Sequence, residues 1–161
     1  MVEVDMKPSE QTALRQLDSP LAYGDFIILY GSHDQIYSVD LEFGGITNNK
    51  FGNYHHEDIV GKCFGSQVSC RNGTGYMYVL KPTPSLVTLS VRHRTQIVYH
   101  ADINLALGLL DAVPGKRFVE AGTGSGSVST SLASACRPGK LFSCEFHLER
   151  KVEAENDFKK Y

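Results

Sequence analysis

The chain has 161 residues, of which 42% are hydrophobic, and its 16 basic and 18 acidic residues give a formal net charge of -2. This length and apolar content allow one core, or a small domain with part of another. A chain so close to neutrality lacks the strongly positive charge of most nucleic-acid-binding proteins, so an RNA partner needs local evidence. No apolar run approaches the roughly 20 residues that span a bilayer, and the acidic start MVEVDMKPSE lacks the order of a signal peptide. We expect a globular, intracellular protein whose four cysteines, without zinc spacing, stay reduced and bind no metal.

Residues 26–90 carry strand-like patterns. Short β-branched or aromatic runs are separated by turn-forming segments such as GGITNNKFGN and CRNGTG, and these runs are DFIILYG, QIYSVDL, GSQVSC, GYMYVLKP and LVTLSV. Their spacing predicts a small antiparallel barrel or sandwich, with Pro82 and Pro84 at an edge or a crossover. We place this first domain at residues 1–94.

From residue 95 onward the apolar residues recur with helical spacing. DINLALGLLDAV predicts a helix that Asp102 caps and that Pro114 and Gly115 end. A strand, a glycine turn, a helix, a second strand and a second helix are then predicted in RFVEAG, GTG, SGSVSTSLASAC, KLFSCEF and LERKVEAENDFKKY. This order is the opening of a doubly wound α/β sheet, and we place the second domain at residues 95–161.

The glycine turn predicts a nucleotide cofactor. Gly122, Gly124 and Gly126 follow the first strand on alternate residues, whereas dinucleotide folds place the last glycine three residues after the second. No Gly-Lys-Ser/Thr follows, which excludes a Walker loop. Glu120 suits a ligand with a sulfonium and an ammonium group, and Glu145 ends the next strand, from which a carboxylate can accept bonds from ribose hydroxyls. These features favour S-adenosylmethionine over NAD. A tight turn without ligand explains one glycine more easily than three.

Three motifs carry a resemblance to a known family. RTQIVYHADI at 94–103, EAGTGSGSVS at 120–129 and CEFHLER at 144–150 closely resemble the catalytic subunits of eukaryotic tRNA (adenine(58)-N(1))-methyltransferases, which modify the T-loop adenosine of tRNA. DIVGKCFGSQVSC and YVLKPTP resemble the N-terminal barrel of that family, so the resemblance covers most of the chain. It implies an α/β protein in which a small N-terminal β-barrel precedes the first part of a Rossmann-like, S-adenosylmethionine-dependent methyltransferase fold.

The resemblance also implies a cofactor site and an RNA-facing surface. The cofactor site would consist of Val98, Gly122, Gly124, Ser125, Gly126, Ser127, Glu145 and Arg150. The glycines and serines would hold the methionine part, Glu145 the ribose, and Arg150 would lie beside that carboxylate. The residues facing the substrate RNA would be Arg94, Gln96, Tyr99 and His100. For Gln96 and Tyr99, a polar turn whose hydrogen bonds are made within the protein is an alternative explanation. The implied partners are tRNA and a homologous noncatalytic subunit in a heterotetramer, and the implied location is the nucleus.

The chain ends after two strand-helix units, whereas the acidic catalytic motif of the family lies beyond the second helix. We therefore assign no catalytic residue and expect an incomplete N-terminal part, inactive alone and prone to aggregate, because two parallel strands cannot cover their own faces. Two alternatives stay open. The chain could be a noncatalytic module that binds RNA or a partner subunit, or a fragment of an NAD-binding oxidoreductase.

Overall fold

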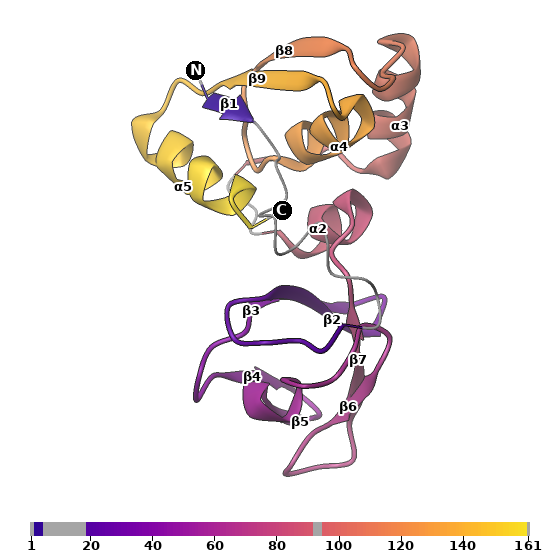
Figure 1. The fold of residues 1–161 in the computed structure, drawn as a ribbon, viewed down its shortest axis with the longest axis vertical. Helices are drawn as coiled ribbons and strands as arrows, with labels where there is room; N and C mark the ends of the chain where they lie inside the picture. Colours follow the sequence, from indigo (N-terminus) through magenta and orange to yellow (C-terminus); the bar gives the residue numbers. More distant parts are fainter. Residues whose placement is uncertain (1, 5–18, 92–94, 161) are drawn as a thin grey trace. The chain divides into compact units, whose positions relative to one another are not determined.

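The computed structural model describes residues 2–4, 19–91 and 95–160 (Figure 1). The chain divides into two compact units. We call Leu14–Leu86 the sheet unit, and Met1–Ala13 together with Val87–Tyr161 the α/β unit. In the described residues, no helix is long and apolar enough to cross a membrane.

The sheet unit contains a four-stranded antiparallel sheet and a separate hairpin. The sheet has the order β3-β2-β7-β6, with β2 at Phe26–Ser32, β3 at Gln35–Asp40, β6 at Gln67–Ser69 and β7 at Tyr76–Leu80. The hairpin pairs β4, Ile46–Asn49, with β5, Gly52–His55, and the short 3-10 helix η1, His56–Asp58, follows it. Ile27, Ile28 and Leu29 of the central strand β2 have no exposed surface. A strand that is apolar on both faces is expected at the centre of a sheet.

Two of the predicted features of this unit are wrong. No closed barrel forms among the described strands, because the sheet is open and the hairpin is not hydrogen-bonded to it. The segment GGITNNKFGN, predicted as a turn, contains most of the hairpin: the Asn49 side chain accepts the N–H of Phe51 at 2.8 Å, and Gly52 takes a φ of 145°. A side-chain bond of this kind closes a tight turn between strands.

The first five residues of the segment LVTLSV, predicted as a strand, lie instead in helix α2, Pro84–Ser90. The Thr83 hydroxyl accepts the N–H of Leu86 at 3.3 Å at the start of this helix, and Pro84 stands at its first position, where a missing N–H costs nothing. The helix start signal therefore outweighs the β-branched composition of the run.

The core of the sheet unit joins the hairpin to the sheet. Tyr54 of β5 is 1% exposed and belongs to the same cluster as Leu29, Met77 and Val79. Side-chain packing therefore connects the hairpin and the sheet, which share no backbone hydrogen bonds between strands.

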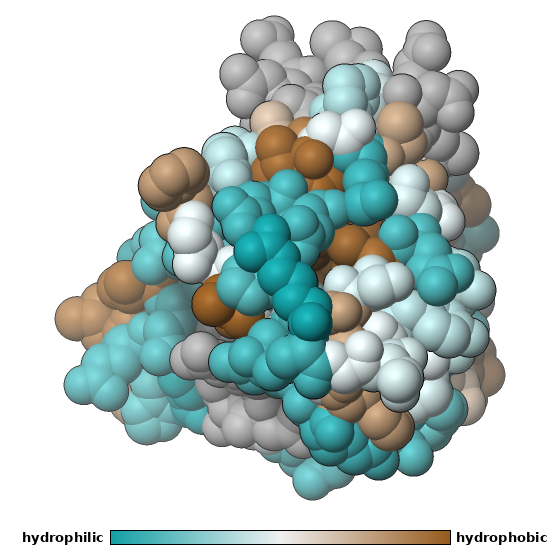
Figure 2. Space-filling model, turned by 90° about the horizontal axis from the view of Figure 1, so that it is seen from below, coloured by the Kyte–Doolittle hydropathy of each residue, from teal (hydrophilic) through white to brown (hydrophobic). Residues whose placement is uncertain are grey.

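Figure 2 shows a face on which hydrophilic residues predominate and apolar residues form only small separate groups.

The α/β unit has the predicted order of strand, glycine turn, helix, strand and helix. Its elements are α3 at His100–Leu109, β8 at Arg117–Ala121, α4 at Ser127–Cys136, β9 at Lys140–Cys144 and α5 at Leu148–Phe158. Strands β8 and β9 pair in parallel, with Val119 opposite Phe142. Helix α3 begins at His100 after Tyr99, so Asp102 is not its cap but lies in its first turn, where a negative charge still favours the helix.

The N-terminus adds a third strand that the sequence did not predict. Strand β1, Val2–Val4, pairs antiparallel with β9, and the sheet order is β1-β9-β8. Within this unit, helices α4 and α5 lie on one side of the sheet (Figure 1). Leu141 of β9 is fully buried in a cluster with Leu132 and Phe158 of these helices, whereas Val119 of β8 is 75% exposed.

His56 of the sheet unit makes the stability of this unit depend on pH. Its Nδ1 accepts the N–H of Glu42 at 3.0 Å, and its Nε2 lies 3.1 Å from the Thr47 hydroxyl. Burial lowers the pKa of His56 below the ordinary value of 6.5 and outweighs the opposing effect of the Glu42 carboxylate. A lowered pKa in the folded state means stability that is complete above 6.5 and lost as the pH falls towards the folded value.

We predict that His56→Gln lowers stability at neutral pH but flattens its loss between about pH 7 and pH 5, the range in which histidine titrates. Urea unfolding followed by circular dichroism measures both effects. His33→Gln is the control, because the His33 side chain is 92% exposed. Equal pH slopes for the wild type and His56→Gln would contradict the prediction.

Candidate cofactor site

The candidate site lies where β8 and β9 end. In a parallel pair both carboxyl ends lie at the same edge, which is where ligands bind in open α/β sheets. The backbone joins the two ends directly, because the N–H of Gly122 donates to the carbonyl of Cys144 at 2.8 Å. Gly124 and Gly126 adopt φ values of 56° and 83°, a left-handed conformation that glycine takes without strain. The loop between β8 and α4 therefore needs glycine for its turn.

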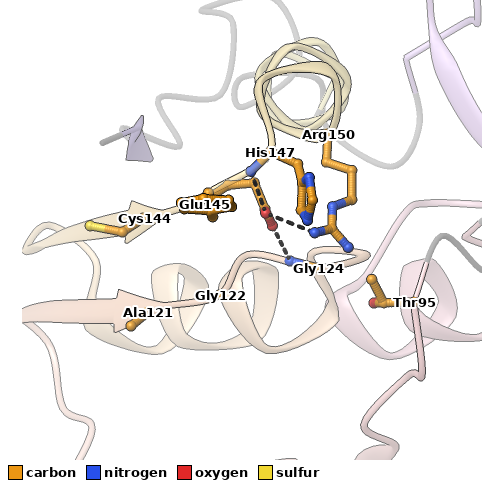
Figure 3. Close-up of a pocket in the computed structure, with 9 residues that line it drawn as sticks. Thr95, Ala121, Gly122, Gly124, Cys144, Glu145, His147 and Arg150 are labelled. Carbon is orange, nitrogen blue, oxygen red and sulfur yellow. Dashed lines mark hydrogen bonds and ion pairs between the residues drawn. The ribbon is translucent and has the colours of Figure 1, made fainter.

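A cavity of about 730 Å³ opens at this edge (Figure 3). Its lining comes from the segment before α3, from both strand ends and from the first turn of α5: Thr95, Ala121, Gly122, Gly124, Cys144, Glu145, Phe146, His147 and Arg150. Phe146 is 95% exposed, and its ring makes an edge-to-face contact with that of His147. The cavity thus combines backbone, a carboxylate, a guanidinium and aromatic rings.

Glu145 is the central charged group of the cavity. Its side chain is 5% exposed, and its Oε2 accepts the N–H of Gly124 at 3.2 Å. Its Oε1 accepts the N–H of His147 at 3.0 Å and lies 3.3 Å from Nη2 of Arg150 (Figure 3). These contacts fix the carboxylate and leave about one acceptor site for a further donor, since a carboxylate offers about four.

The segment before α3 is tied to the glycine loop by hydroxyl groups. The N–H of Thr95 donates to the Ser125 hydroxyl at 3.2 Å, and the Ser127 hydroxyl donates to the Val98 carbonyl at 3.1 Å. Both serines are buried, whereas the Val98 side chain is 40% exposed. The two serines that the resemblance assigns to the cofactor thus hold this segment against the loop, and Thr95 takes a place in the cavity lining.

Glu120 does not line the cavity. Its Oε2 accepts the hydroxyl of Ser129 at 2.5 Å and that of Ser143 at 2.6 Å. Burial raises the pKa of Glu120, and the two hydroxyl bonds act in the opposite direction. The sequence suggested that Glu120 receives the ammonium group of the ligand. Its hydrogen bonds to Ser129 and Ser143 show that it also has a structural alternative, as an acceptor for two buried hydroxyls.

The RNA-facing residues implied by the resemblance are distributed around the start of α3. Gln96 and Tyr99 are exposed, and His100 is half-buried. Arg94 lies outside the described residues, as do its neighbours Arg92 and His93. Whether these side chains contact RNA stays a prediction.

Sequence reasoning did not single out several cavity residues. Thr95 lies in the motif RTQIVYHADI, and Phe146 and His147 lie in CEFHLER. The motifs therefore marked these positions, but they assigned no role to these three side chains. In the described residues, no group of three or more histidine, cysteine or acidic side chains is placed to hold a metal ion.

A residue other than glycine in a left-handed conformation costs about 1 to 2 kcal/mol. We predict that Gly124→Ala lowers the stability of the α/β unit by more than this amount. A Cβ at Gly124 would lie 2.8 Å from the Thr95 hydroxyl oxygen. Gly115→Ala is the matched control, because Gly115 also has a positive φ but no atom within 4 Å of the added Cβ. Thermal unfolding should show the larger loss for Gly124→Ala and a partial recovery on adding Thr95→Ala. Equal losses of stability for Gly124→Ala and Gly115→Ala, with no recovery on adding Thr95→Ala, would contradict the prediction.

Comparison with known proteins supports the resemblance. A tRNA (adenine(58)-N(1))-methyltransferase catalytic subunit of Dictyostelium discoideum is 42% identical over 137 residues, which are 84% of this chain and 44% of that protein. The corresponding subunit of Kluyveromyces lactis is 39% identical over 142 residues, 86% of this chain and 34% of that protein. The chain therefore spans less than half the length of these curated relatives.

Two solved structures share the fold. A SAM-dependent O-methyltransferase of Thermotoga maritima matches with a TM-score of 0.76 and 29% identity, covering 88% of this chain and 53% of that one. A tRNA (m1A58) methyltransferase of Aquifex aeolicus matches with a TM-score of 0.65 and 20% identity, over 87% of this chain and 53% of that one. The mixed α/β arrangement of SAM-dependent methyltransferases is thus confirmed.

The sequence model of one family, described as tRNA methyltransferase complex GCD14 subunit, matches residues 75–161. That range contains α2, the whole strand-helix succession and every described residue of the cavity. The chain belongs to the tRNA methyltransferase complex GCD14 subunit family.

Proposed function

We propose that this chain carries the cofactor-binding part of a tRNA (adenine(58)-N(1))-methyltransferase catalytic subunit. The enzyme would transfer a methyl group from S-adenosylmethionine to N1 of the T-loop adenosine of tRNA. The observation that carries the proposal is the placement of the glycine loop and Glu145 side by side at the edge where β8 and β9 end. The names of the curated relatives supply the substrate.

The cavity residues fit S-adenosylmethionine. A Cβ built on Gly122 meets no atom within 4 Å, so the glycine leaves open space in the lining for a ligand. Glu145 has acceptor capacity for a ribose hydroxyl, and Arg150 holds that carboxylate in place. When bound, the cofactor supplies a methyl group activated by a sulfonium. NAD would bring a pyrophosphate instead, for which the alternate glycine spacing is less suited.

The contribution of this chain to the reaction is placement. Attack of the adenine N1 lone pair on a methyl group needs the two reacting atoms in line, and an enzyme gains rate by holding them so. Gly124 and Glu145 are the described groups that would set the position of the cofactor. The exposed residues Gln96 and Tyr99 precede α3, where an aromatic ring can stack on an extruded base.

We also propose that tRNA binding needs a homologous noncatalytic subunit in a heterotetramer. The chain's net charge of -2 supports this, because tRNA binding otherwise requires a basic surface from the chain itself. The second candidate is a noncatalytic module that binds only the partner subunit or RNA. A chain that binds its partner subunit but supports no methyl transfer would identify this module.

We predict that Glu145→Ala weakens S-adenosylmethionine binding roughly 10- to 100-fold, as expected for lost hydrogen bonds to a charged group. Calorimetry on the full chain with its partner subunit measures the affinity, and transfer of labelled methyl groups to tRNA, mapped to the modified adenosine, measures the activity. Glu149→Gln is the control, because Glu149 is an exposed acid in the first turn of α5 and does not line the cavity. Binding of NAD in place of S-adenosylmethionine would contradict the proposed function.

A further inference from the structure

A chain of hydroxyl groups links Glu120 to the glycine loop. Oε2 of Glu120 accepts bonds from Ser129 of α4 and Ser143 of β9, and the Ser143 oxygen lies 2.7 Å from the Thr123 hydroxyl. Ser129 and Ser143 have no exposed surface, and Thr123 is 4% exposed. The set connects β8, β9, α4 and the loop by direct side-chain contacts. We call these four residues the Glu120 network.

The carboxylate fixes the direction of every bond in the network. Each hydroxyl has one hydrogen to donate, and an ionised carboxylate can only accept. Ser143 therefore gives its hydrogen to Glu120, and Thr123 must give its own to Ser143. Thr123 stands between Gly122 and Gly124, so this last bond turns its side chain into the protein and leaves the glycines facing the cavity.

We propose that Glu120 is a positioning residue, which through Ser143 and Thr123 holds the glycine loop in the conformation that receives the cofactor. The inference deepens the proposed function and rests on it for the identity of the ligand. Ala121 and Gly122, the next residues along the chain, line the cavity, whereas Glu120 points to the other face of the sheet with Ser143. The acid thus acts on the loop, and the cofactor contacts what the loop presents.

Two variants of Glu120 separate positioning from direct binding. In Glu120→Gln the amide oxygen still accepts both serine hydroxyls, whereas in Glu120→Leu the buried donors lose their acceptor. We expect Glu120→Leu to weaken S-adenosylmethionine binding by the full chain roughly tenfold or more, and Glu120→Gln to stay within about threefold, as the cost of an unpaired buried donor implies. Thr123→Val should weaken binding like Glu120→Leu, and the double variant should add little.

The control is Ser131→Ala, because Ser131 is also buried on α4 but donates to the backbone of its own helix. It should leave binding unchanged. Equal losses for Glu120→Gln and Glu120→Leu, with no effect of Thr123→Val, would overturn the proposal and make Glu120 a charged ligand of the cofactor.

Amide hydrogen exchange tests the proposal independently of cofactor binding. The N–H groups of Gly122 and Gly126 are hydrogen-bonded to Cys144 and Thr123, so a fixed loop protects them. Exchange at these amides should accelerate in Glu120→Leu and Thr123→Val but not in Glu120→Gln or Ser131→Ala. Unchanged exchange would overturn the positioning role. If the wild-type chain binds no S-adenosylmethionine, the proposed function is overturned. The exchange rates of the Gly122 and Gly126 amides would then still test whether Glu120 positions the loop.

Discussion

The parallel pairing of β8 with β9 is the constraint on which the candidate site depends. The register sets Ala121 opposite Cys144, so the glycine loop and Glu145 leave the sheet side by side. The same register sets Glu120 opposite Ser143 on the face that α4 covers. Because side chains alternate along a strand, a slip of one residue would turn Glu120 and Ser143 away from each other and carry Glu145 past the loop. Cavity and supporting network therefore have a single origin in the strand register.

Helix α4 supports the site through an unusual run of buried hydroxyl groups. Thr130 and Ser131 donate to backbone carbonyls one turn earlier in their own helix. Ser127 and Ser129 instead donate outside the helix, to the Val98 carbonyl and to Glu120. The hydroxyls of the first pair have acceptors in the backbone at the start of α4, and those of the second pair bond to neighbouring elements. Each of these four buried hydroxyls therefore has a hydrogen-bond acceptor. The loop is thus held from two sides, by the segment before α3 and by the network behind β8.

The sequence was sufficient for the parts of the fold whose signals are local. The glycines after an apolar run, and Pro138 after the last helical residue of α4, mark the ends of strand and helix directly. The open sheet with its separate hairpin and the strand Val2–Val4 depend on contacts between distant residues, which local patterns do not encode. In LVTLSV a helix start at Thr83 and Pro84 overrides β-branched composition. At the site, the motifs identified Glu145 and the glycines, but the contacts of Ser125, Ser127 and Glu120 with other protein groups required the three-dimensional structure.

The central claim is that the edge formed by β8 and β9 is a site for S-adenosylmethionine. Nuclear magnetic resonance titration of the labelled full chain tests this claim most directly, because each loop glycine and Glu145 has its own backbone amide signal. The account predicts saturable shifts at Gly122, Gly124, Gly126 and Glu145 with S-adenosylmethionine or S-adenosylhomocysteine, and none at these positions with NAD. Shifts induced by NAD alone, or no shifts at this edge with any of the three compounds, would contradict it.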